Sequence, residues 1–314
     1  MKSPVSFLTF SPPGLAHRHG GWSRFRQIIR LTGVISAAVA LQACSAVKLA
    51  YNNAPELAYW YFDSYVDFTT AQSFYVKEEL AGLQAWHRPN QLPGYVDTLQ
   101  NVRQKMLADL NASQACEVFA DARSKMIAVT AHAQRAVATL AVMLTPDQLI
   151  QMERKFEKGN KKYREDYLEA PAGQSRKKRY EEAVSRAEML YGRLEHPQLE
   201  RISFAIDQSG FNARMSYEER LRRQKDISQT VRLVATGIAT PGFVNEKAHE
   251  EMRALFDRAF SSPNTAYRDY FEKLTQTGCR SFSELHNSTT AVQRNKAVET
   301  IVGYEQDLKT LVSK

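Results

Sequence analysis

Residues 112–143 read ASQACEVFADARSKMIAVTAHAQRAVATLAVM, and this stretch decides the fold class. Its apolar residues recur at steps of three and four, which is the spacing of one face of an α-helix. They are Val118, Ala122, Met126, Val129, Ala133, Ala136 and Leu140. Alanine favours helix formation, and its small side chain permits close packing. The pattern predicts a long helix that packs against its neighbours along this face.

The same period continues on both sides of this stretch. It predicts further helices over residues 91–110, 146–168, 174–193, 198–238, 241–260, 264–276 and 290–312. No stretch alternates convincingly between polar and apolar residues, as a half-buried strand would. Residues 170–173, Ala-Pro-Ala-Gly, form a clear break. We predict an all-α fold, an elongated multi-helix bundle, with a candidate sub-boundary near 170–174.

The N-terminus has the order of a secretory signal. Residues 1–44 carry five basic side chains and no acidic one, and an apolar stretch runs from Leu31 to Leu41. That stretch is shorter than the roughly 20 residues needed to span a bilayer, so cleavage is favoured over a transmembrane helix. We expect a signal peptide over 1–43, a tether over 44–54 and a helical domain over 55–314.

Leu41-Gln42-Ala43-Cys44 resembles the lipobox of bacterial lipoproteins. The resemblance implies cleavage between Ala43 and Cys44, with acyl chains such as palmitate on Cys44. Ser45 follows where an Asp would favour retention in the inner membrane, which implies an outer-membrane anchor facing the periplasm. Two or more acyl chains hold a protein stably to a membrane. The alternative is an ordinary signal peptide with an incidental cysteine.

Two cysteines remain beyond the predicted signal, Cys116 and Cys279. An even number in an oxidising compartment predicts one disulfide. It would close a long loop and contribute at most about 5 kcal/mol to stability. Two buried free thiols are the alternative.

The net charge of +8 overstates how basic the helical domain is. Five of the 42 basic residues fall in the predicted signal, so the remainder barely exceeds the 34 acidic residues. A nucleic-acid partner is therefore not expected. Two basic clusters stand beside acids, at 176–179 and 220–225. They fit solvated helix faces with local ion pairs, or else a positive surface for anionic lipid.

Aromatic residues are concentrated soon after the predicted tether. They are Tyr51, Tyr59, Trp60, Tyr61, Phe62, Tyr65, Phe68, Phe74 and Tyr75. We favour a first core helix rich in rings. The alternative is an interfacial belt, because aromatic rings favour the level of the lipid headgroups and the predicted lipid is close in sequence.

A Thr-x-x-Gln pattern recurs where helices are predicted to begin. The pairs are Thr69 with Gln72, Thr145 with Gln148, and Thr290 with Gln293. Each pair fits a capping box. In this motif the Thr hydroxyl accepts a hydrogen bond from the backbone N–H of the Gln three residues later, and the Gln side-chain carbonyl accepts one from the backbone N–H of the Thr. Leu144-Thr145-Pro146-Asp147-Gln148 also resembles the Leu-Thr-x-x-Gln motif of the Spy/CpxP-type periplasmic stress proteins, which act as chaperones or signalling adaptors.

The segment 86–95, Trp-His-Arg-Pro-Asn-Gln-Leu-Pro-Gly-Tyr, is the most distinctive in the chain. Trp86, His87, Arg88 and Tyr95 are candidate surface residues, and a polar corner with Trp86 packed inward is the favoured interpretation. With the lipobox and the Leu-Thr motif, the segment resembles an uncharacterised family of Gram-negative envelope lipoproteins over nearly the whole chain. The resemblance implies a helical fold and an envelope address, but no activity.

No catalytic constellation stands out. The histidines and cysteines lack metal-ligand spacing, and Gly-rich phosphate loops and nucleophile motifs are missing. We expect no metal or cofactor and a non-enzymatic binding or structural module, with the membrane and another envelope protein or anionic lipid as candidate partners. The alternatives are a membrane-tethered chaperone or stress adaptor and, last, an enzyme acting on peptidoglycan or lipid.

Overall fold

The computed structural model describes residues 46–235 and 246–313. Ala43, Cys44 and the predicted signal peptide lie outside the described residues. Residues 50–314 form one compact unit, separate from residues 1–49.

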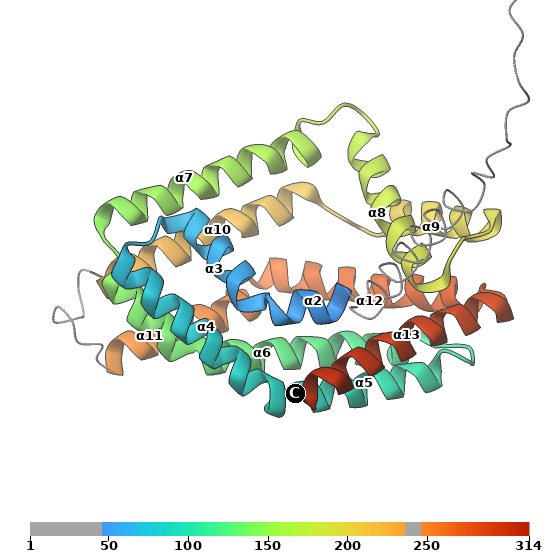
Figure 1. The fold of residues 1–314 in the computed structure, drawn as a ribbon. Helices are drawn as coiled ribbons and strands as arrows, with labels where there is room; N and C mark the ends of the chain where they lie inside the picture. The colour runs from blue at the N-terminus through green and yellow to red at the C-terminus, as the bar shows by residue number, and fades with distance from the viewer. Residues whose placement is uncertain (1–45, 236–245, 314) are drawn as a thin grey trace, which may run out of the picture. The chain divides into compact units, whose positions relative to one another are not determined.

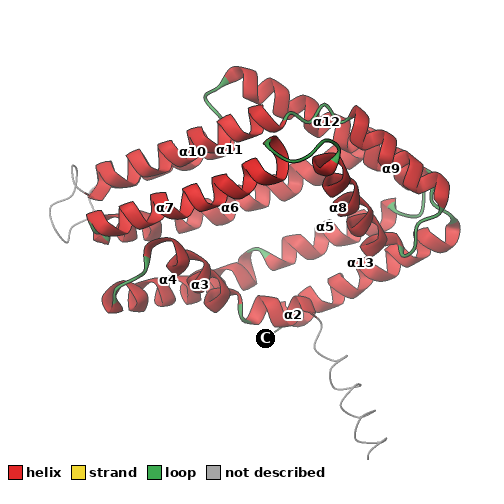
Figure 2. Ribbon diagram, turned by 90° about the horizontal axis from the view of Figure 1, so that it is seen from above, coloured by secondary structure: helices red, strands yellow, loops and turns green. Residues whose placement is uncertain are grey.

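In the part of the chain that the structure describes, every element is helical (Figures 1 and 2). The all-α prediction is therefore confirmed. In chain order the helices are α2 (Ala46–Asn52), α3 (Ala54–Val66), α4 (Thr70–Asn90), α5 (Leu92–Lys105), α6 (Ala112–Met143), α7 (Pro146–Tyr163) with the π-helical turn η1 (Arg164–Leu168), α8 (Gln174–Tyr191), α9 (His196–Gln208), α10 (Ala213–Leu233), α11 (Glu246–Phe260), α12 (Thr265–Asn287) and α13 (Ala291–Val312).

Several boundaries differ from the sequence prediction. The single helix predicted over 198–238 is wrong, since α9 and α10 replace it. Gly210 stands between them with φ of 67°, a conformation that glycine adopts without strain. The side chain of Asn212 then accepts from the backbone N–H of Met215 and caps α10. Helix α12 runs past the predicted end at 276, and most of the predicted tether is helical in α2. The break at 170–173 is a turn within the compact unit.

Two separate clusters of buried side chains form the core. The first lies among α3, α6, α7, α10 and α11, with Ala138, Leu149, Val234 and Met252 among its members. The second lies among α5, α8, α9, α12 and α13 and surrounds Tyr191. Helices α5 and α13 pack side by side there (Figure 1). Helix α6 contacts both α11 and α12, so it joins the two clusters.

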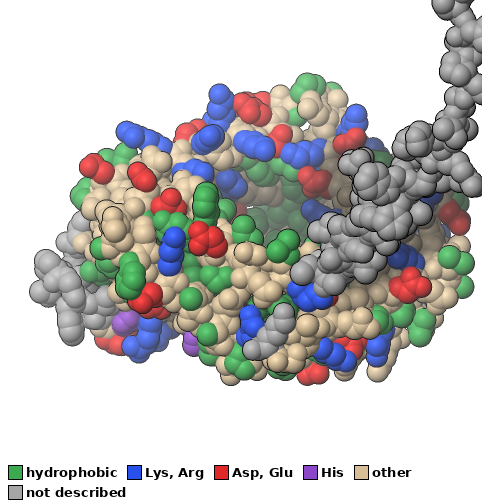
Figure 3. All heavy atoms as spheres, viewed as in Figure 1, with side chains coloured by type: hydrophobic (Ala, Val, Ile, Leu, Met, Phe, Trp, Pro, Cys, Tyr) green, Lys and Arg blue, Asp and Glu red, His purple; other side chains and the backbone are tan. Residues whose placement is uncertain are grey.

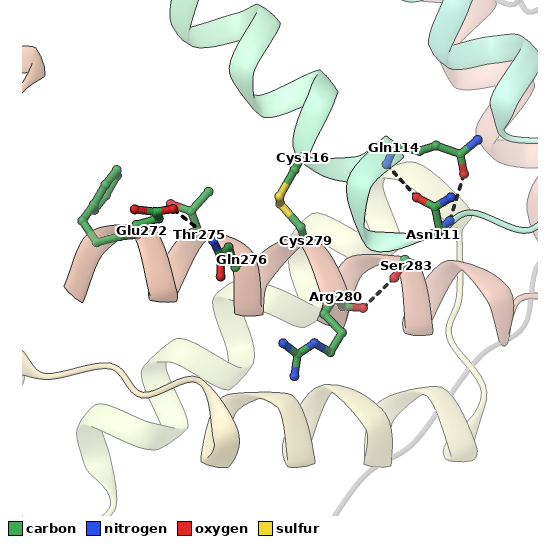
Figure 4. The surroundings of a disulfide bond; sticks show 10 residues. Asn111, Gln114, Cys116, Glu272, Thr275, Gln276, Cys279, Arg280 and Ser283 are labelled. Carbon is green, nitrogen blue, oxygen red and sulfur yellow. Dashed lines mark hydrogen bonds between the residues drawn. A yellow bond between two sulfur atoms is a disulfide. The ribbon is translucent and has the colours of Figure 1, made fainter. Parts of the chain in front are cut away.

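A disulfide fixes α6 to α12. Cys116 and Cys279 are bonded, with their Cα atoms 5.3 Å apart (Figure 4). Cys279 is fully buried. The predicted pairing is confirmed, and it links segments 163 residues apart in sequence.

Helix α6 is long and apolar enough to cross a membrane by length and composition alone. In this fold it packs against α12, α11 and α4 instead. It also carries Asp121, Arg123 and Lys125 near its middle.

The predicted capping boxes all form, and their glutamines do more than cap. Gln72 and Gln148 begin α4 and α7, and each amide donates to the other's Oε1 at 3.0 and 2.6 Å. Gln198 and Gln293, at the starts of α9 and α13, repeat the arrangement at 2.7 and 2.8 Å. All four are buried. The Thr-x-x-Gln motifs therefore join pairs of helix N-termini inside the protein.

Sequence reasoning missed one member of these pairs. Gln198 follows Glu195, which caps α9 in a capping box. The pattern was not recognised because Glu is an unusual cap. A further box, Asn111 with Gln114, begins α6.

Candidate functional site

The apolar face predicted to be the core of α6 is only partly covered. Its fully buried residues lie towards its two ends, at Ala115, Ala138 and Ala141. Between them, Val118 and Val129 are half-buried and Met126 is 59% exposed. The middle of α6 thus runs between the two core clusters without a partner that buries it. An apolar surface left open on a domain of this kind marks a site of interaction.

This open face is the floor of a groove with a volume of about 560 Å³. Such a volume lies within the roughly 300–1,000 Å³ usual for small-molecule sites. The lining residues are Val118, Asp121, Ala122, Lys125, Met126 and Val129 from α6, Tyr95, Thr98 and Leu99 from α5, His87 from α4 and Leu308 from α13. A few of these residues carry the polar groups of the lining, and the rest of the lining is apolar. This is the usual composition of a site for an apolar ligand.

At one side of the groove, a chain of hydrogen bonds runs through His87. Its Nδ1 is 3.1 Å from the Tyr51 hydroxyl, and its Nε2 is 3.2 Å from the Tyr95 hydroxyl. Burial lowers the pKa of His87 and raises the pKa of Tyr95, which Asp121 raises further. The neutral ring can donate to one tyrosine and accept from the other. This fixes Tyr95 at the edge of the groove.

A second polar group lies at the contact between α5 and α6. Lys125 Nζ donates to Asp121 Oδ1 at 2.5 Å, and Thr98 Oγ1 donates to Oδ2 at 2.6 Å. These hydrogen bonds lower the pKa of Asp121, that from Lys125 most. Lys125 Nζ is also 5.9 Å from the centre of the Tyr95 ring. The groove therefore has an ordered polar edge that combines a cation, a carboxylate and two hydroxyls.

The four predicted surface residues of segment 86–95 have different partners. His87 and Tyr95 meet at the groove, while the Arg88 guanidinium lies 5.6 Å from the centre of the Tyr51 ring. Trp86 stacks on His132 of α6 with ring centres 3.7 Å apart. Pro89 lies in the last turn of α4 and Pro93 in the first turn of α5, so only Gln91 separates the two helices.

The aromatic segment is divided between core and surface. Tyr65 and Phe68 pack on the first core cluster, as predicted. Trp60 and Tyr61 are 67% and 59% exposed, and Leu57 is 59% exposed. These three residues share one face of α3 by their spacing of three and four. The core interpretation is wrong for this face.

The two basic clusters have different surroundings. In the first, Arg176 holds Asp207 with two hydrogen bonds of 2.6 and 2.7 Å, and Lys178 donates to Asp166 at 2.5 Å. In the second, Glu219 is buried, which opposes its ionisation. Hydrogen bonds from Arg222 and Arg223 outweigh that effect and lower its pKa. On the face drawn in Figure 3, basic and acidic side chains are interspersed.

No group of three or more His, Cys, Asp or Glu side chains that could hold a metal ion occurs within residues 46–235 and 246–313. The groove contains a single histidine and a single carboxylate. Its chemistry is that of binding an apolar group beside a few hydrogen-bonding partners.

In the comparison with known proteins, the model of a family of unknown function, DUF6279, matches residues 64–241. That is more than half of the chain. The chain belongs to this family. No curated protein and no solved structure matches it. The matched range includes His87, Tyr95 and all of α6, but not Leu308, so most of the groove lies in the shared region.

Sequence reasoning found His87 and Tyr95 but not the groove. Met126 was assigned only to the apolar stripe of residues 112–143, and Asp121 and Lys125, which lie beside that stripe, were not selected. The sequence signal for the groove was the apolar periodicity of this stretch. Beside the apolar stripe stand Asp121 and Lys125, which are one helical turn apart. Whether another helix covers the stripe depends on packing between helices that are distant in sequence. The periodicity of one helix does not predict that packing.

Proposed function

We propose that this protein is a lipid-anchored lipoprotein of the Gram-negative cell envelope that binds the acyl chain of a lipid in the groove between α5 and α6. The observation that carries this proposal is the uncovered apolar face of α6 beside the ordered polar edge at His87 and Lys125. The proposed role is non-enzymatic binding, because the polar groups of that edge are hydrogen-bonded to one another and the floor beside them is apolar.

The membrane anchor is supported by the sequence around Cys44 and by the exposed face of α3. Trp and Tyr side chains prefer the bilayer interface, where their rings are shielded and their polar atoms stay hydrated. Trp60 and Tyr61 follow Cys44 closely in sequence. Intact-mass measurement of the protein purified from membranes should give a chain that begins at an acylated Cys44. A chain that retains residues 1–43 without lipid would contradict the anchor.

A lipid is the favoured occupant because the chain connectivity keeps the groove near the anchor. Tyr51, which hydrogen-bonds His87 at the groove, is seven residues from Cys44. Seven residues span at most about 25 Å, so an anchored protein holds this edge close to the bilayer surface. The apolar floor suits an acyl chain, and the hydroxyls and Lys125 suit its polar head.

The test is the binding of a lysophospholipid to the purified protein, with two methionine variants. Met126 lies in the groove and is 59% exposed, and Met189 on α8 lies outside it and is 64% exposed. Because both side chains are exposed, glutamate at either position should leave folding intact. Met126→Glu should weaken binding about tenfold or more, since a charge opposes burial of an apolar group. Met189→Glu should not, and equal affinities for both variants would contradict the groove.

A chaperone role is the second candidate, and the apolar floor of the groove is what favours it. An extended apolar segment of an unfolded protein presents the same chemistry as an acyl chain. The Leu-Thr-x-x-Gln motif no longer supports this role, because Gln148 is buried against Gln72. Suppression of client aggregation by the wild-type protein but not by Met126→Glu would favour the chaperone.

A further inference from the structure

A second site lies away from the groove, around Arg220 of α10. Its Nε donates to Asn160 Oδ1 at 2.8 Å, and Asn160 on α7 is buried. Gln224 exchanges two further hydrogen bonds with the same amide, at 2.7 and 2.9 Å. The Arg220 guanidinium is therefore held in one place rather than extended into solvent.

The chain allows this position because residue 159 is glycine. A Cβ atom at Gly159 would lie 2.7 Å from an Arg220 Nη atom, which is closer than atoms of this kind approach. The guanidinium thus lies across the backbone of α7. Any larger residue at 159 would displace it.

The positive charge of Arg220 is not balanced by an ion pair in the described part of the chain. Its neighbours Arg222, Arg223 and Arg258 form ion pairs with Glu219 and Asp226 at 2.8 to 3.3 Å. Among the described residues, no carboxylate lies within ion-pair distance of Arg220. Three guanidinium groups therefore share these two carboxylates, and Arg220 adds a fourth guanidinium beside them. Lys155 adds a further cation, 5.4 Å from the centre of the Tyr65 ring.

Arg220 and Arg223 line a cavity of about 320 Å³. Its walls include the rings of Tyr65, Phe156 and Tyr267, and Ser216 and Gln224 add hydrogen-bonding groups. Glu219 also lines the cavity, and its carboxylate accepts hydrogen bonds from Arg222 and Arg223. On the face drawn in Figure 3, the surface is hollowed below α7, and Lys and Arg side chains occur along the upper rim. Guanidinium groups match the oxygen geometry of phosphate, and a partly enclosed cavity strengthens such charge-assisted hydrogen bonds.

We propose that this cavity is a binding site for a phosphate group, held by Arg220 and Arg223 with Ser216 as a further donor. The aromatic walls suit a ligand with more than the phosphate alone. The phosphate can belong to a lipid headgroup or to a small soluble molecule. The site is independent of the acyl-chain groove, so either can fail without the other.

The experiment is a calorimetric titration of the full-length protein in detergent with inorganic phosphate. Arg220→Gln removes the surplus charge and should weaken binding about ten- to a hundredfold, the usual worth of one or two charge-assisted hydrogen bonds. Arg186→Gln is the matched control, because Arg186 is an exposed arginine on α8 outside the cavity. Equal binding by both variants, or no binding by the wild type, would overturn the proposal.

A second variant keeps the charge and tests the geometry. Gly159→Ala should displace the guanidinium and weaken phosphate binding severalfold. Gly82→Ala in α4 should not, because nothing lies within 4 Å of a Cβ there. Unchanged binding in Gly159→Ala with the wild-type fold would also overturn the site. Met126→Glu should bind phosphate normally.

Competition identifies the source of the phosphate. A short-chain phosphatidic acid, added below its micelle concentration, should displace inorganic phosphate if the ligand is a lipid headgroup. Displacement by glycerol phosphate but not by the lipid would assign a soluble ligand. Either result supports a phosphate site, and displacement by neither would contradict it.

Discussion

At the scale of single residues, buried polar side chains determine much of the stability. Gln148 illustrates the point, because its amide pairs with Gln72 and also donates to the Asp67 carbonyl at 3.1 Å. The sequence predicted the local capping role of this residue correctly. It could not predict the partner, since Gln72 lies 76 residues away.

Replacing this amide should be far more costly than removing an ordinary cap. Gln148→Ala leaves Gln72 without its buried partner, and we expect a loss of about 2–4 kcal/mol in the free energy of unfolding. Gln114→Ala, which removes a more exposed box glutamine at the start of α6, should cost about 0.5–1 kcal/mol. Chemical denaturation of both variants checks this, and similar losses would contradict the paired arrangement.

Buried histidines should make stability depend on pH. His286 is fully buried, its Nε2 donates to the Ala108 carbonyl at 2.9 Å, and its Nδ1 accepts from the Tyr191 hydroxyl at 2.9 Å. Burial lowers the pKa of His286, as it does that of His87. The unfolded chain therefore takes up protons at a higher pH than the folded one.

It follows that stability should fall as the pH drops below the unfolded value of about 6.5. Above that pH both states are neutral at these rings, and stability should not change through them. His286→Gln should lower stability overall but flatten its pH dependence between pH 7 and 5, and His87→Gln should flatten it further. Denaturation curves at several pH values measure this, and a slope unaffected by either change would contradict it.

At the scale of elements, periodicity predicted where the helices are, and packing decided what they contact. The boundaries of α6 were predicted from residues 112–143, and its apolar stripe was identified. The stripe was expected to pack against neighbouring helices, yet its centre is the floor of the groove. A stripe that faces a ligand and one that faces another helix have the same spacing.

The link between α6 and α12 should contribute measurably to stability. Replacing both Cys116 and Cys279 with alanine removes the constraint on the unfolded chain, and we expect a loss of about 2–5 kcal/mol. Thermal unfolding with and without reductant measures it. Reduction should lower the wild-type midpoint and leave the double variant unchanged, whereas an unaffected wild type would contradict the bond's role.

The exposed face of α3 should contact the bilayer. After the proposed cleavage before Cys44, Trp60 and Trp86 are the remaining tryptophans, so Trp86→Phe leaves Trp60 as the fluorescent tryptophan. In vesicles of brominated phospholipids, Trp60 emission should be strongly quenched, because its ring would lie at the interface. The matched variant Trp60→Phe, which leaves Trp86 stacked on His132, should be quenched much less. Equal quenching would contradict the contact.

At the scale of the whole molecule, α6 joins two core clusters, and the middle of this helix is the floor of an open apolar groove. Sequence reasoning predicted the all-α class and the unknown family, and both are confirmed. The lipid anchor at Cys44 remains a prediction. The groove and the phosphate site were not predicted, because each is assembled from helices far apart in the chain.

The most direct test of the groove is photo-crosslinking with a fatty acid that carries a diazirine on its acyl chain. The probe is added to the purified full-length protein, and the labelled peptides are identified by mass spectrometry. We predict labels concentrated on α6 between Val118 and Val129 and on α5 near Leu99, with loss of these labels in Met126→Glu. Labels spread evenly over the helices, or unchanged in that variant, would contradict the account.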